Sequence, residues 1–504
     1  MFLSDCALID LTGLLLALIT IFITYYKWSF TYWKNLNVPY LKPSIPMGNL
    51  APPSASKEHF SLVVKHIYDE LKRQKSRHGG FFLFARPAYL VIDLEYVKNV
   101  FTKDFKYFND RGVYYNEKDD PISAHLFTVS GEKWKNLRTK LTPTFTSGKM
   151  KMMFQTLLDC EKNLHEKIEE LYERNEPLDV KKLLSCYTMD VIGSCAFGIE
   201  CNSFKDGPAS FREYGLKFFN MSKWENFVFG LSMNYPKVAK ALKVRAVSKS
   251  VSDFFTNVVK DNVEYRERNH YSRKDFMQLL IEMKGKGTQN GTGLTLDEIT
   301  AQSFVFFLAG FETSSSATSW AMFELAKNPD IQDKLRDEIN SVVAKHNGKV
   351  TYEALQEMKY MDQVINETLR KYPPGAVLSR ECTQDYKVPD QNVIIKKGIR
   401  IFIPVLGIHY DEEYYPDPDK FDPERFNEEN SKSRPHYAHI PFGEGPRICI
   451  GLRFGVMQTK VGLTSLLMKY KFTLNEKTGR RPKFSAYAFV LTPEEEILLN
   501  AEKI

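Results

Sequence analysis

The sequence lacks the features that mark disulfide-stapled and nucleic-acid-binding proteins. Its seven cysteines form no Cys-x-x-Cys pair and show no regular spacing, which argues against a disulfide framework and favours a reducing compartment. The net charge of +7 is modest for 504 residues. It gives no case for nucleic acid, although it suits a basic patch that faces an acidic partner or an anionic membrane. Internal repeats and low-complexity tracts are also absent.

Long apolar runs are scarce as well, and the one present stands at the N-terminus. Residues 11–26 read LTGLLLALITIFITYY without a charge, close to the ~20 residues that cross a bilayer. Lys27 and Lys34 follow, with Trp28, Tyr32 and Trp33 as interfacial aromatics. A cleaved signal peptide would need a basic n-region and a small-x-small cleavage site, and neither is evident. We therefore expect a transmembrane signal anchor over 1–27, with the body in the cytosol.

A proline-rich stretch separates the anchor from the rest of the chain. Pro39, Pro43 and Pro46 fall within eight residues, and proline disfavours helix in the residue before it. We predict a stiff, extended hinge over 28–50 and one cooperative catalytic domain over 51–504, although a length prior of about 150 residues per domain allows three.

The body is predicted to be mainly α with a small β-sheet region. The longest helical pattern runs over 296–327; Thr295 and Glu298 have capping-box spacing before it, and Pro329 stops it. A strand pair is expected within 79–93 and further short strands within 393–404. Near-continuous apolarity over 304–310 predicts that the long helix crosses the middle of a large core.

The stretch PFGEGPRICIGLRFG, residues 441–455, surrounds a lone thiol with glycines and an arginine. As a nucleophile, Cys449 would need a base, and no histidine lies within nine residues, although a distant one could fold close. As a zinc ligand it would have His436 and His439 but no fourth ligand. Gly443 and Gly451 let backbone amides turn toward the sulfur. A single thiolate before an apolar helix suits an iron whose other ligands come from a macrocycle, which is haem.

This stretch resembles the haem-binding loop of the cytochrome P-450 monooxygenases, whose pattern is Phe-x-x-Gly-x-Arg-x-Cys-x-Gly. Phe442, Gly445, Arg447, Cys449 and Gly451 occupy every fixed position. The resemblance implies the cytochrome P-450 fold, with Cys449 as the axial ligand of the haem iron. It also implies that Arg447 pairs with a haem propionate and that Phe442 packs beside the sulfur.

Three further motifs occur in the order along the chain that this family requires. Glu367 and Arg370 in ETLR, with Arg425 in FDPERF, resemble the buried network that supports the cysteine loop. The segment AGFET supplies Ala309, where a flat ring can approach the helix, and the acid–alcohol pair Glu312 and Thr313 for proton delivery. The resemblance also implies contacts with the haem propionates by Trp134, Arg138 and Arg380.

The resemblance is closest to microsomal members that include insect xenobiotic-metabolising enzymes, a likeness carried also by FKYFNDRG, residues 105–112. It implies insertion of one atom of O2 into lipophilic small molecules, xenobiotics or endogenous hormones and lipids. Electrons would come from NADPH through a reductase flavoprotein, with cytochrome b5 as a further candidate partner. The expected location is the endoplasmic reticulum membrane, on its cytosolic face. Lysines 133, 135 and 140 are candidates for a reductase-facing surface, or simply for a solvated helix face.

Two questions stay open at this stage. A haem-thiolate sensor or carrier would share the cysteine loop, and a peroxide-dependent isomerase would too, although Thr313 argues against the isomerase. Substrate contacts are expected from the aromatic and turn residues Phe108–Tyr115, Phe127, Phe304, Phe307, Phe311, Ala376–Leu378 and Phe489. Plain core packing is the alternative for each of these residues.

Overall fold

The structure is a computed structural model that describes residues 5–50, 58–205, 211–219, 222–285, 293–481 and 483–504. The chain forms two compact units. The first comprises Met1–Asp110 and Val377–Ile408, and the second comprises Arg111–Ala376 and His409–Ile504. The expected fold class, mainly α with small sheets, is confirmed.

The first unit is built around a four-stranded sheet with the order β1-β2-β7-β4. The expected strand pair forms as a tight antiparallel hairpin, and a crossover brings β7 parallel to β2. The strands are β1 (His78–Leu83), β2 (Arg86–Val91), β4 (Leu378–Glu381) and β7 (Arg400–Ile403). Smaller elements complete the unit: α3 (Phe60–Arg73), α4 (Leu94–Lys98), β5 (Tyr386–Lys387) and β6 (Ile394–Ile395).

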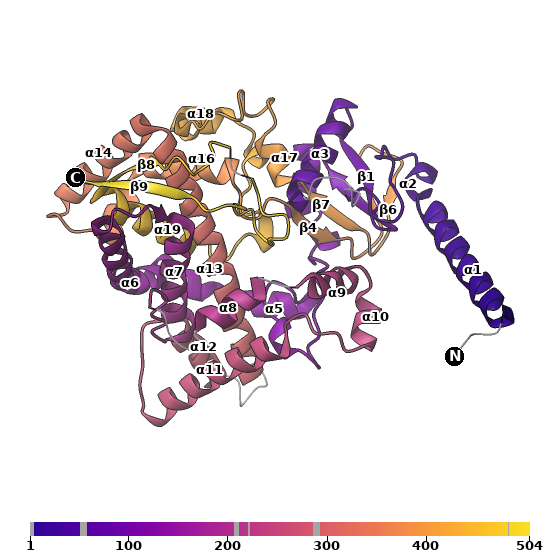
Figure 1. Cartoon of the computed structure of the whole chain (residues 1–504), viewed down its shortest axis with the longest axis horizontal. Helices are drawn as coiled ribbons and strands as arrows, with labels where there is room; N and C mark the ends of the chain where they lie inside the picture. Colours follow the sequence, from indigo (N-terminus) through magenta and orange to yellow (C-terminus); the bar gives the residue numbers. More distant parts are fainter. Residues whose placement is uncertain (1–4, 51–57, 206–210, 220–221, 286–292, 482) are drawn as a thin grey trace. The chain divides into compact units, whose positions relative to one another are not determined.

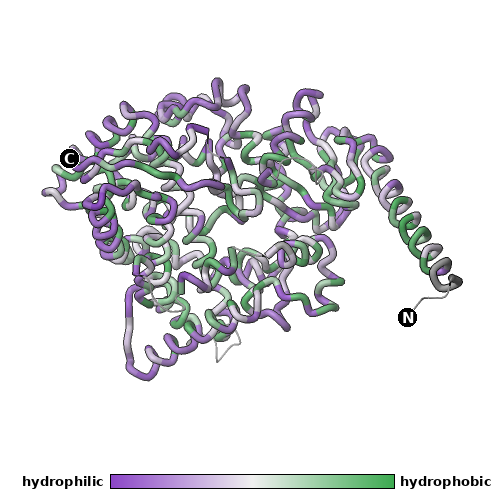
Figure 2. Tube along the Cα trace, viewed as in Figure 1, coloured by the Kyte–Doolittle hydropathy of each residue, from purple (hydrophilic) through white to green (hydrophobic). Residues whose placement is uncertain are grey.

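Helix α1 (Asp5–Ser29) carries the apolar run, and Figure 2 shows it as hydrophobic over most of its length. Within the described residues, 10–35 form the one stretch long and apolar enough to cross a membrane. Helix α2 (Tyr32–Asn35) follows, inside the expected hinge, and buries Trp33, whose Nε1 donates to the carbonyl of Phe81 at 3.1 Å. Residues 40 and 48 then pair with β1, so this segment lies against the sheet.

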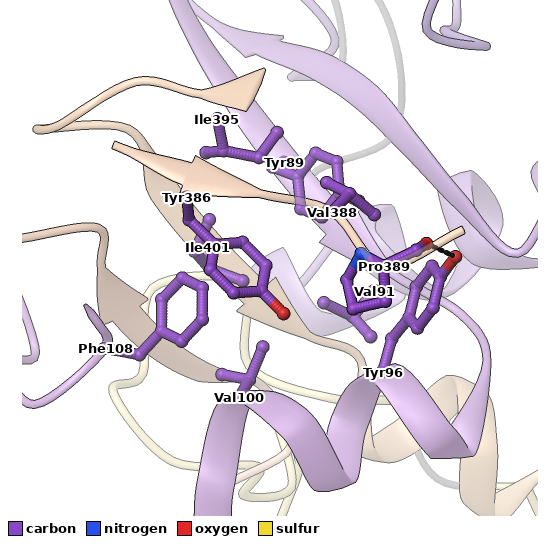
Figure 3. A pocket seen from close by; sticks show the side chains of 10 residues that line it. All are labelled: Tyr89, Val91, Tyr96, Val100, Phe108, Tyr386, Val388, Pro389, Ile395 and Ile401. Atoms are coloured by element: carbon purple, nitrogen blue, oxygen red, sulfur yellow. Dashed lines mark hydrogen bonds between the residues drawn. The ribbon is translucent and has the colours of Figure 1, made fainter. Parts of the chain in front are cut away.

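The core of the first unit contains an apolar gap, which Figure 3 shows between the sheet, α4 and the β5–β6 hairpin. Three tyrosines line it, Tyr89, Tyr96 and Tyr386, and two of their hydroxyls donate hydrogen bonds within the unit. Tyr96 donates to the carbonyl of Pro389 at 2.8 Å, and Tyr386 donates to Oδ2 of Asp104 at 2.7 Å. Apart from the three tyrosines, the lining side chains are hydrocarbon, so we interpret the gap as imperfect core packing and not as a binding site.

The second unit is mostly helical, with helices packed around α13 (Leu296–Lys327) (Figure 1). Its other helices include α5 (Gly131–Leu141), α6 (Ser147–Glu173), α7 (Val180–Ile192), α8 (Phe211–Phe219), α9 (Lys223–Asn234), α10 (Pro236–Ala241), α11 (Lys249–Arg268) and α12 (Phe276–Gly285). Further along the chain lie α14 (Pro329–Lys345), α15 (Tyr352–Glu357), α16 (Lys359–Lys371), α18 (Glu428–Ser433) and α19 (Leu452–Leu467). A three-stranded sheet has the order β3-β9-β8, with β3 (Leu178–Asp179), β8 (Tyr470–Leu474) and β9 (Leu498–Lys503). Helix α17 (Val405–His409) ends at the boundary between the units.

Helix α13 matches its predicted bounds and is the centre of the second unit. The capping box forms as expected: Thr295 Oγ1 accepts from the amide of Glu298, whose carboxylate accepts from the amide of Thr295. Residues 299–307 and 314–326 are buried. The segment between them is not, because four of its six residues are partly accessible and Ala309 is exposed. A helix through a core therefore opens on one side midway along its length.

A buried ion pair joins the C-terminal ends of α13 and α16. Lys371 Nζ lies 2.8 Å from Glu324 Oε1, which also accepts from the hydroxyl of Tyr372 at 2.5 Å. Both charged side chains are almost fully buried. Removing one partner of such a pair strands the other charge in a medium that solvates it poorly.

We predict that Glu324→Gln lowers the free energy of unfolding by about 3–5 kcal/mol, because the Lys371 ammonium loses its counter-charge. Denaturant unfolding of the full chain, followed by circular dichroism, measures the change. The control is Glu428→Gln, which breaks the exposed pair Lys432–Glu428 and should leave stability nearly unchanged. Equal effects of the two substitutions would contradict the prediction.

Candidate active site

The cysteine loop is shaped by two glycines with left-handed backbone. Gly443 and Gly445 have φ of 70° and 72°, a region that other residues rarely adopt. The turn brings the amide of Cys449 to 3.0 Å from the carbonyl of Phe442. Phe442 is partly buried beside it. The loop then runs through a short 3-10 turn, Gly445–Arg447, into α19.

The amide of Gly451 hydrogen-bonds to the sulfur of Cys449, although the φ of −89° at Gly451 is open to any residue. A Cβ placed there would meet only Phe145, at 3.9 Å. Neither the turn nor packing within the chain therefore requires glycine. Open space beside a glycine of ordinary conformation is what a bound group approaching the backbone would need.

The thiol of Cys449 is the one exposed thiol among the six cysteines that the structure describes. Its surroundings act on the pKa of the Cys449 thiol in opposite directions. Burial raises this pKa, while the amide of Gly451 and the charges of Arg111 and Arg138 oppose the rise. No histidine of the described chain hydrogen-bonds to it, and the described His, Cys, Asp and Glu side chains form no metal-binding cluster. The geometry thus favours neither a nucleophile with a histidine base nor a zinc site.

Positive charge gathers around this thiol. Arg447 is buried, stacks 4.1 Å above the ring of Trp134 and donates to the carbonyl of Val129 at 3.1 Å. Arg111 donates to the carbonyl of Arg447 at 3.2 Å. Burial lowers the pKa of Arg111 to about 10, although Cys449 opposes the shift. The structure therefore brings Trp134 and Arg447 together as predicted, and adds Arg111, for which the sequence predicted a place in the substrate-contacting loop Phe108–Tyr115 but no role beside the thiol.

Arg138 indicates which kind of ligand this cluster of positive side chains could bind. It is partly buried on α5, burial lowers its pKa, and no carboxylate of the described residues forms an ion pair with it. A desolvated cation without a counter-charge favours an anionic ligand. Haem offers an iron for one thiolate and two carboxylates for arginines, so the donor set fits it.

Helix α13 stands close to the cysteine loop. A Cβ on Gly455, in the first turns of α19, would lie 3.8 Å from the hydroxyl of Ser314. Beside it, Thr313 donates from Oγ1 to the carbonyl of Ala309 at 2.5 Å. The exposed Ala309 and the hydroxyl of Thr313 thus lie in the opening of α13. Thr313 directly precedes Ser314, the residue of α13 that lies beside α19. Gly310, the neighbour of Ala309 in AGFET, packs on Ile192 of α7, whose Cδ1 would lie 2.5 Å from a Cβ.

Glu312 points toward α7. Its Oε1 lies 2.8 Å from Nζ of Lys181, which also donates to the hydroxyls of Ser315 and Ser316, at 2.8 and 3.1 Å. The acid and the alcohol of the predicted pair are therefore neighbours without a hydrogen bond between them. Lys181 was missed because it lies 131 residues away and carries no local motif.

The predicted support of the cysteine loop is present and extends further than expected. Glu367 and Arg370 are fully buried and joined by two hydrogen bonds of 2.7 and 2.8 Å, and Arg425 Nε lies 3.6 Å from Glu367. Arg370 also donates to the carbonyl of His409 at 2.9 Å. The Nε2 of His409 in turn accepts from the amide of Ile440, at 3.1 Å, at the start of the loop.

Three of the predicted substrate contacts belong to the core. Phe304, Phe307 and Phe311 are fully buried and meet an aromatic cluster from α8 and α11, with Phe307 stacked on Phe311 at 5.6 Å. On a helix they lie on the side away from Ala309 and Thr313. The core-packing interpretation is therefore the one that the geometry supports. Phe127 stays a candidate because it is partly exposed beside Arg111, 4.3 Å from the guanidinium.

Arg380 lies in β4, in the first unit, where its guanidinium sits 5.0 Å from the ring of Phe101. Because the other predicted site residues belong to the second unit, its contact with a propionate stays a prediction. Phe108 is buried in the first unit, and Phe489 is highly exposed in the second.

Comparison with known proteins gives the family of the chain. The family model for cytochrome P450 matches residues 58–500. The chain is 42% identical to "Probable cytochrome P450 6a14" of Drosophila melanogaster over 489 residues, 94% of this chain and 96% of that protein. It is also 42% identical to "Cytochrome P450 6A1" of Musca domestica over 484 residues, 95% of both chains. A match across the catalytic body at this identity shows that the chain belongs to the cytochrome P450 family and is a P450 monooxygenase.

Proposed function

We propose that this monooxygenase inserts one atom of O2 into lipophilic small molecules, xenobiotics or endogenous hormones and lipids, with NADPH electrons delivered by a separate reductase flavoprotein. One observation carries the proposal. The accessible thiol of Cys449 lies in the loop that leads into α19, and α19 approaches α13 at Ser314, next to the opening where a hydroxyl and a small residue replace the buried side chains of the rest of the helix. When bound, haem supplies the oxygen chemistry.

The residues around the loop have separable roles in this proposal. Cys449 is the iron ligand, and the amide of Gly451 with Arg111 and Arg138 stabilises its negative charge. Arg447, Arg138 and Trp134 hold the propionates, with Arg380 as a further candidate. Phe442 and Gly443 shape the loop, and Gly451 leaves room beside its backbone for the bound group. Ala309 leaves room for the ring.

Proton delivery is assigned to Thr313 and Glu312. The Thr313 hydroxyl donates to a backbone carbonyl in the resting structure, so its lone pairs remain available to accept from a water molecule. Glu312, held by Lys181 on a partly accessible face, is the acid that exchanges protons with solvent. A non-catalytic haem-thiolate sensor or carrier is the alternative, and it would need neither side chain.

Membrane contact is proposed at two places. Helix α1 is the anchor, in the endoplasmic reticulum membrane with the body on its cytosolic face. In the second unit, α9 and α10 expose a stripe of large apolar side chains, 37–72% accessible, at helical spacing: Trp224, Phe227, Leu231, Tyr235, Val238 and Leu242. Exposed lysines at 237, 240 and 243 flank the stripe. An apolar face with a basic border is typical of a helix that lies in a lipid interface.

The lysines on α5 that could face a reductase have acidic neighbours. Lys133 pairs with Glu117 and lies 3.9 Å from Glu298, and Lys135 lies 3.8 Å from Glu132. These acidic neighbours offset the positive charge, which leaves the lysines near α5 as a weaker candidate for a reductase-facing surface. Cytochrome b5 remains a second candidate partner.

We predict that Cys449→Ala abolishes the thiolate signature in the spectrum of the CO-bound ferrous protein, because the iron loses its sulfur ligand. Cys160→Ala, at a partly buried cysteine in α6, is the control and should keep the signature. A retained signature in Cys449→Ala would refute the assignment of the axial ligand.

Thr313→Ala should uncouple the reaction, so that NADPH consumption continues while product per NADPH falls about tenfold or more and peroxide release rises. Both products are measured in the reconstituted system with its reductase. Thr318→Ala is a suitable control, since this buried threonine on the same helix makes the same type of hydrogen bond, to the carbonyl of Ser314. Unchanged coupling in Thr313→Ala would overturn the proton-delivery role and revive the alternative function.

Trp224 is expected to lie in the lipid interface. Brominated lipids in reconstituted vesicles should quench part of the tryptophan fluorescence of the full chain, and Trp224→Phe should remove that part. Trp320→Phe, at a fully buried tryptophan, should remove only unquenched signal. If Trp224 contributes no quenched fluorescence, α9 and α10 do not contact lipid.

A further inference from the structure

Residues 111–127, here called the arch, form a loop whose two ends meet at the candidate site. Arg111 Nη1 donates to the carbonyl of Phe127 at 3.2 Å, and its guanidinium stacks on the ring of Phe127. The ends touch both sides of the site. Arg111 bonds to Arg447 in the cysteine loop, while the amide of Leu126 donates to Gln302 of α13 at 2.9 Å.

The densest polar attachment of the far part of the arch is to residues 244–247, which connect α10 with α11. Elsewhere Glu117 pairs with Lys133 of α5, the amide of Tyr114 donates to the sulfur of Met233 in α9 at 3.4 Å, and residues 121–123 pack on α13. The fully buried carboxylate of Asp120 accepts from the amides of Ala246 and Val247 at 2.9 and 3.0 Å, and from Nη2 of Arg245 at 3.1 Å. Arg245 also donates to the carbonyl of Asp119 at 2.6 Å. The hydroxyl of Tyr114 donates to the carbonyl of Val244 at 2.6 Å.

These polar contacts matter because α9 and α10, which precede residues 244–247, are held in place by little apolar packing. The buried residues of α9 and α10 are Ser232, Asn234 and Ala239, while their large apolar side chains are partly or fully exposed. A helix pair with so little buried apolar surface has low local stability. The hydrogen bonds to Asp120 therefore carry much of the attachment between this helix pair and the arch.

Asp120 is suited to this task by its charge. An ionised carboxylate accepts at both oxygens, which the two amides and the guanidinium require. An asparagine in its place would turn an NH2 group toward one of these donors. Arg245 is 31% exposed whereas Asp120 is fully buried, so solvent reaches the attachment from the arginine side.

We propose that Asp120 is a positioning residue that holds the arch closed over the candidate site and thereby limits the rate at which lipophilic ligands enter and leave. The inference rests on the proposed function, in which the site takes a lipophilic ligand, and on Phe127 as a candidate contact for that ligand. The Asp120–Arg245 contact acts on exchange rates because it fastens the wall of the site without touching the ligand. Arg111 and Phe127 are the arch residues through which it acts.

The first test measures ligand exchange in the haem-loaded full chain. The probe is 1-dodecylimidazole, a lipophilic imidazole followed by its spectral shift on binding iron in stopped flow. In Asp120→Asn and Arg245→Gln, association and dissociation rates should both rise about tenfold, the effect of losing a charge-assisted hydrogen bond. The dissociation constant should change by less than about threefold, because both rates move together.

A matched control separates this role from general destabilisation. Arg266 and Asp275 form a buried ion pair in the same unit, with hydrogen bonds of 2.9 and 2.6 Å. Asp275→Asn should lower the melting temperature at least as much as Arg245→Gln and leave both exchange rates unchanged. Unchanged rates in the Asp120 and Arg245 variants, or an equal rise in Asp275→Asn, would overturn the proposal.

The second test is independent of the haem. Hydrogen–deuterium exchange of the full chain should rise at residues 112–127 and 242–248 together in Arg245→Gln, since one contact protects both segments. A rise in only one segment would contradict the proposal. If 1-dodecylimidazole produces no spectral shift in the unmodified chain, the proposed function fails; normal binding with unchanged rates refutes the role of Asp120 alone.

Discussion

The cysteine loop depends on an ion pair to which none of its own residues contributes. Glu367 and Arg370 are fully buried and turn their remaining hydrogen-bonding capacity toward the segment that leads to the loop. Arg370 holds the carbonyl of His409, and the ring of His409 holds the amide of Ile440, three residues before Gly443. Burying both charges is costly, so the network is stable only when every member is present. A thiol on a glycine-rich loop can keep a fixed position because this network is rigid.

Helix α13 packs one of its faces into the core and leaves another face accessible, without a break in its geometry. Side chains three and four residues apart share a face, and Phe304, Phe307 and Phe311 use one face to complete an aromatic core. Ala309 and Thr313 fall on another face, which remains accessible. Because the backbone between them is tied by the Thr313 hydroxyl and packed on α7 through Gly310, the opening does not loosen the helix.

The sequence alone predicts those parts of the site that lie in one continuous stretch. Cys449 with its glycines, the bounds of α13 and its capping box, and the Glu367–Arg370 pair all have local signatures, and the structure has them as predicted. Arg111, Lys181 and His409 have none, because each acts on residues that only the fold brings near. The same limit applies to two glycines whose surroundings only the fold reveals. Gly310 packs on α7, whereas Gly451 stands beside open space while its amide hydrogen-bonds to Cys449.

Three buried carboxylates, Glu324, Glu367 and Asp120, join remote segments of the second unit, and each receives a cation. Their surroundings differ in one respect that bears on motion. The cations of Glu324 and Glu367 are themselves buried, so separating either pair would expose two desolvated charges to a core that does not solvate them. The arginine that meets Asp120 lies at the surface and connects to helices with few buried side chains. Water can replace that arginine's hydrogen bonds as the contact opens. Asp120 is therefore the carboxylate of the three that can release its partner while the rest of the unit stays folded.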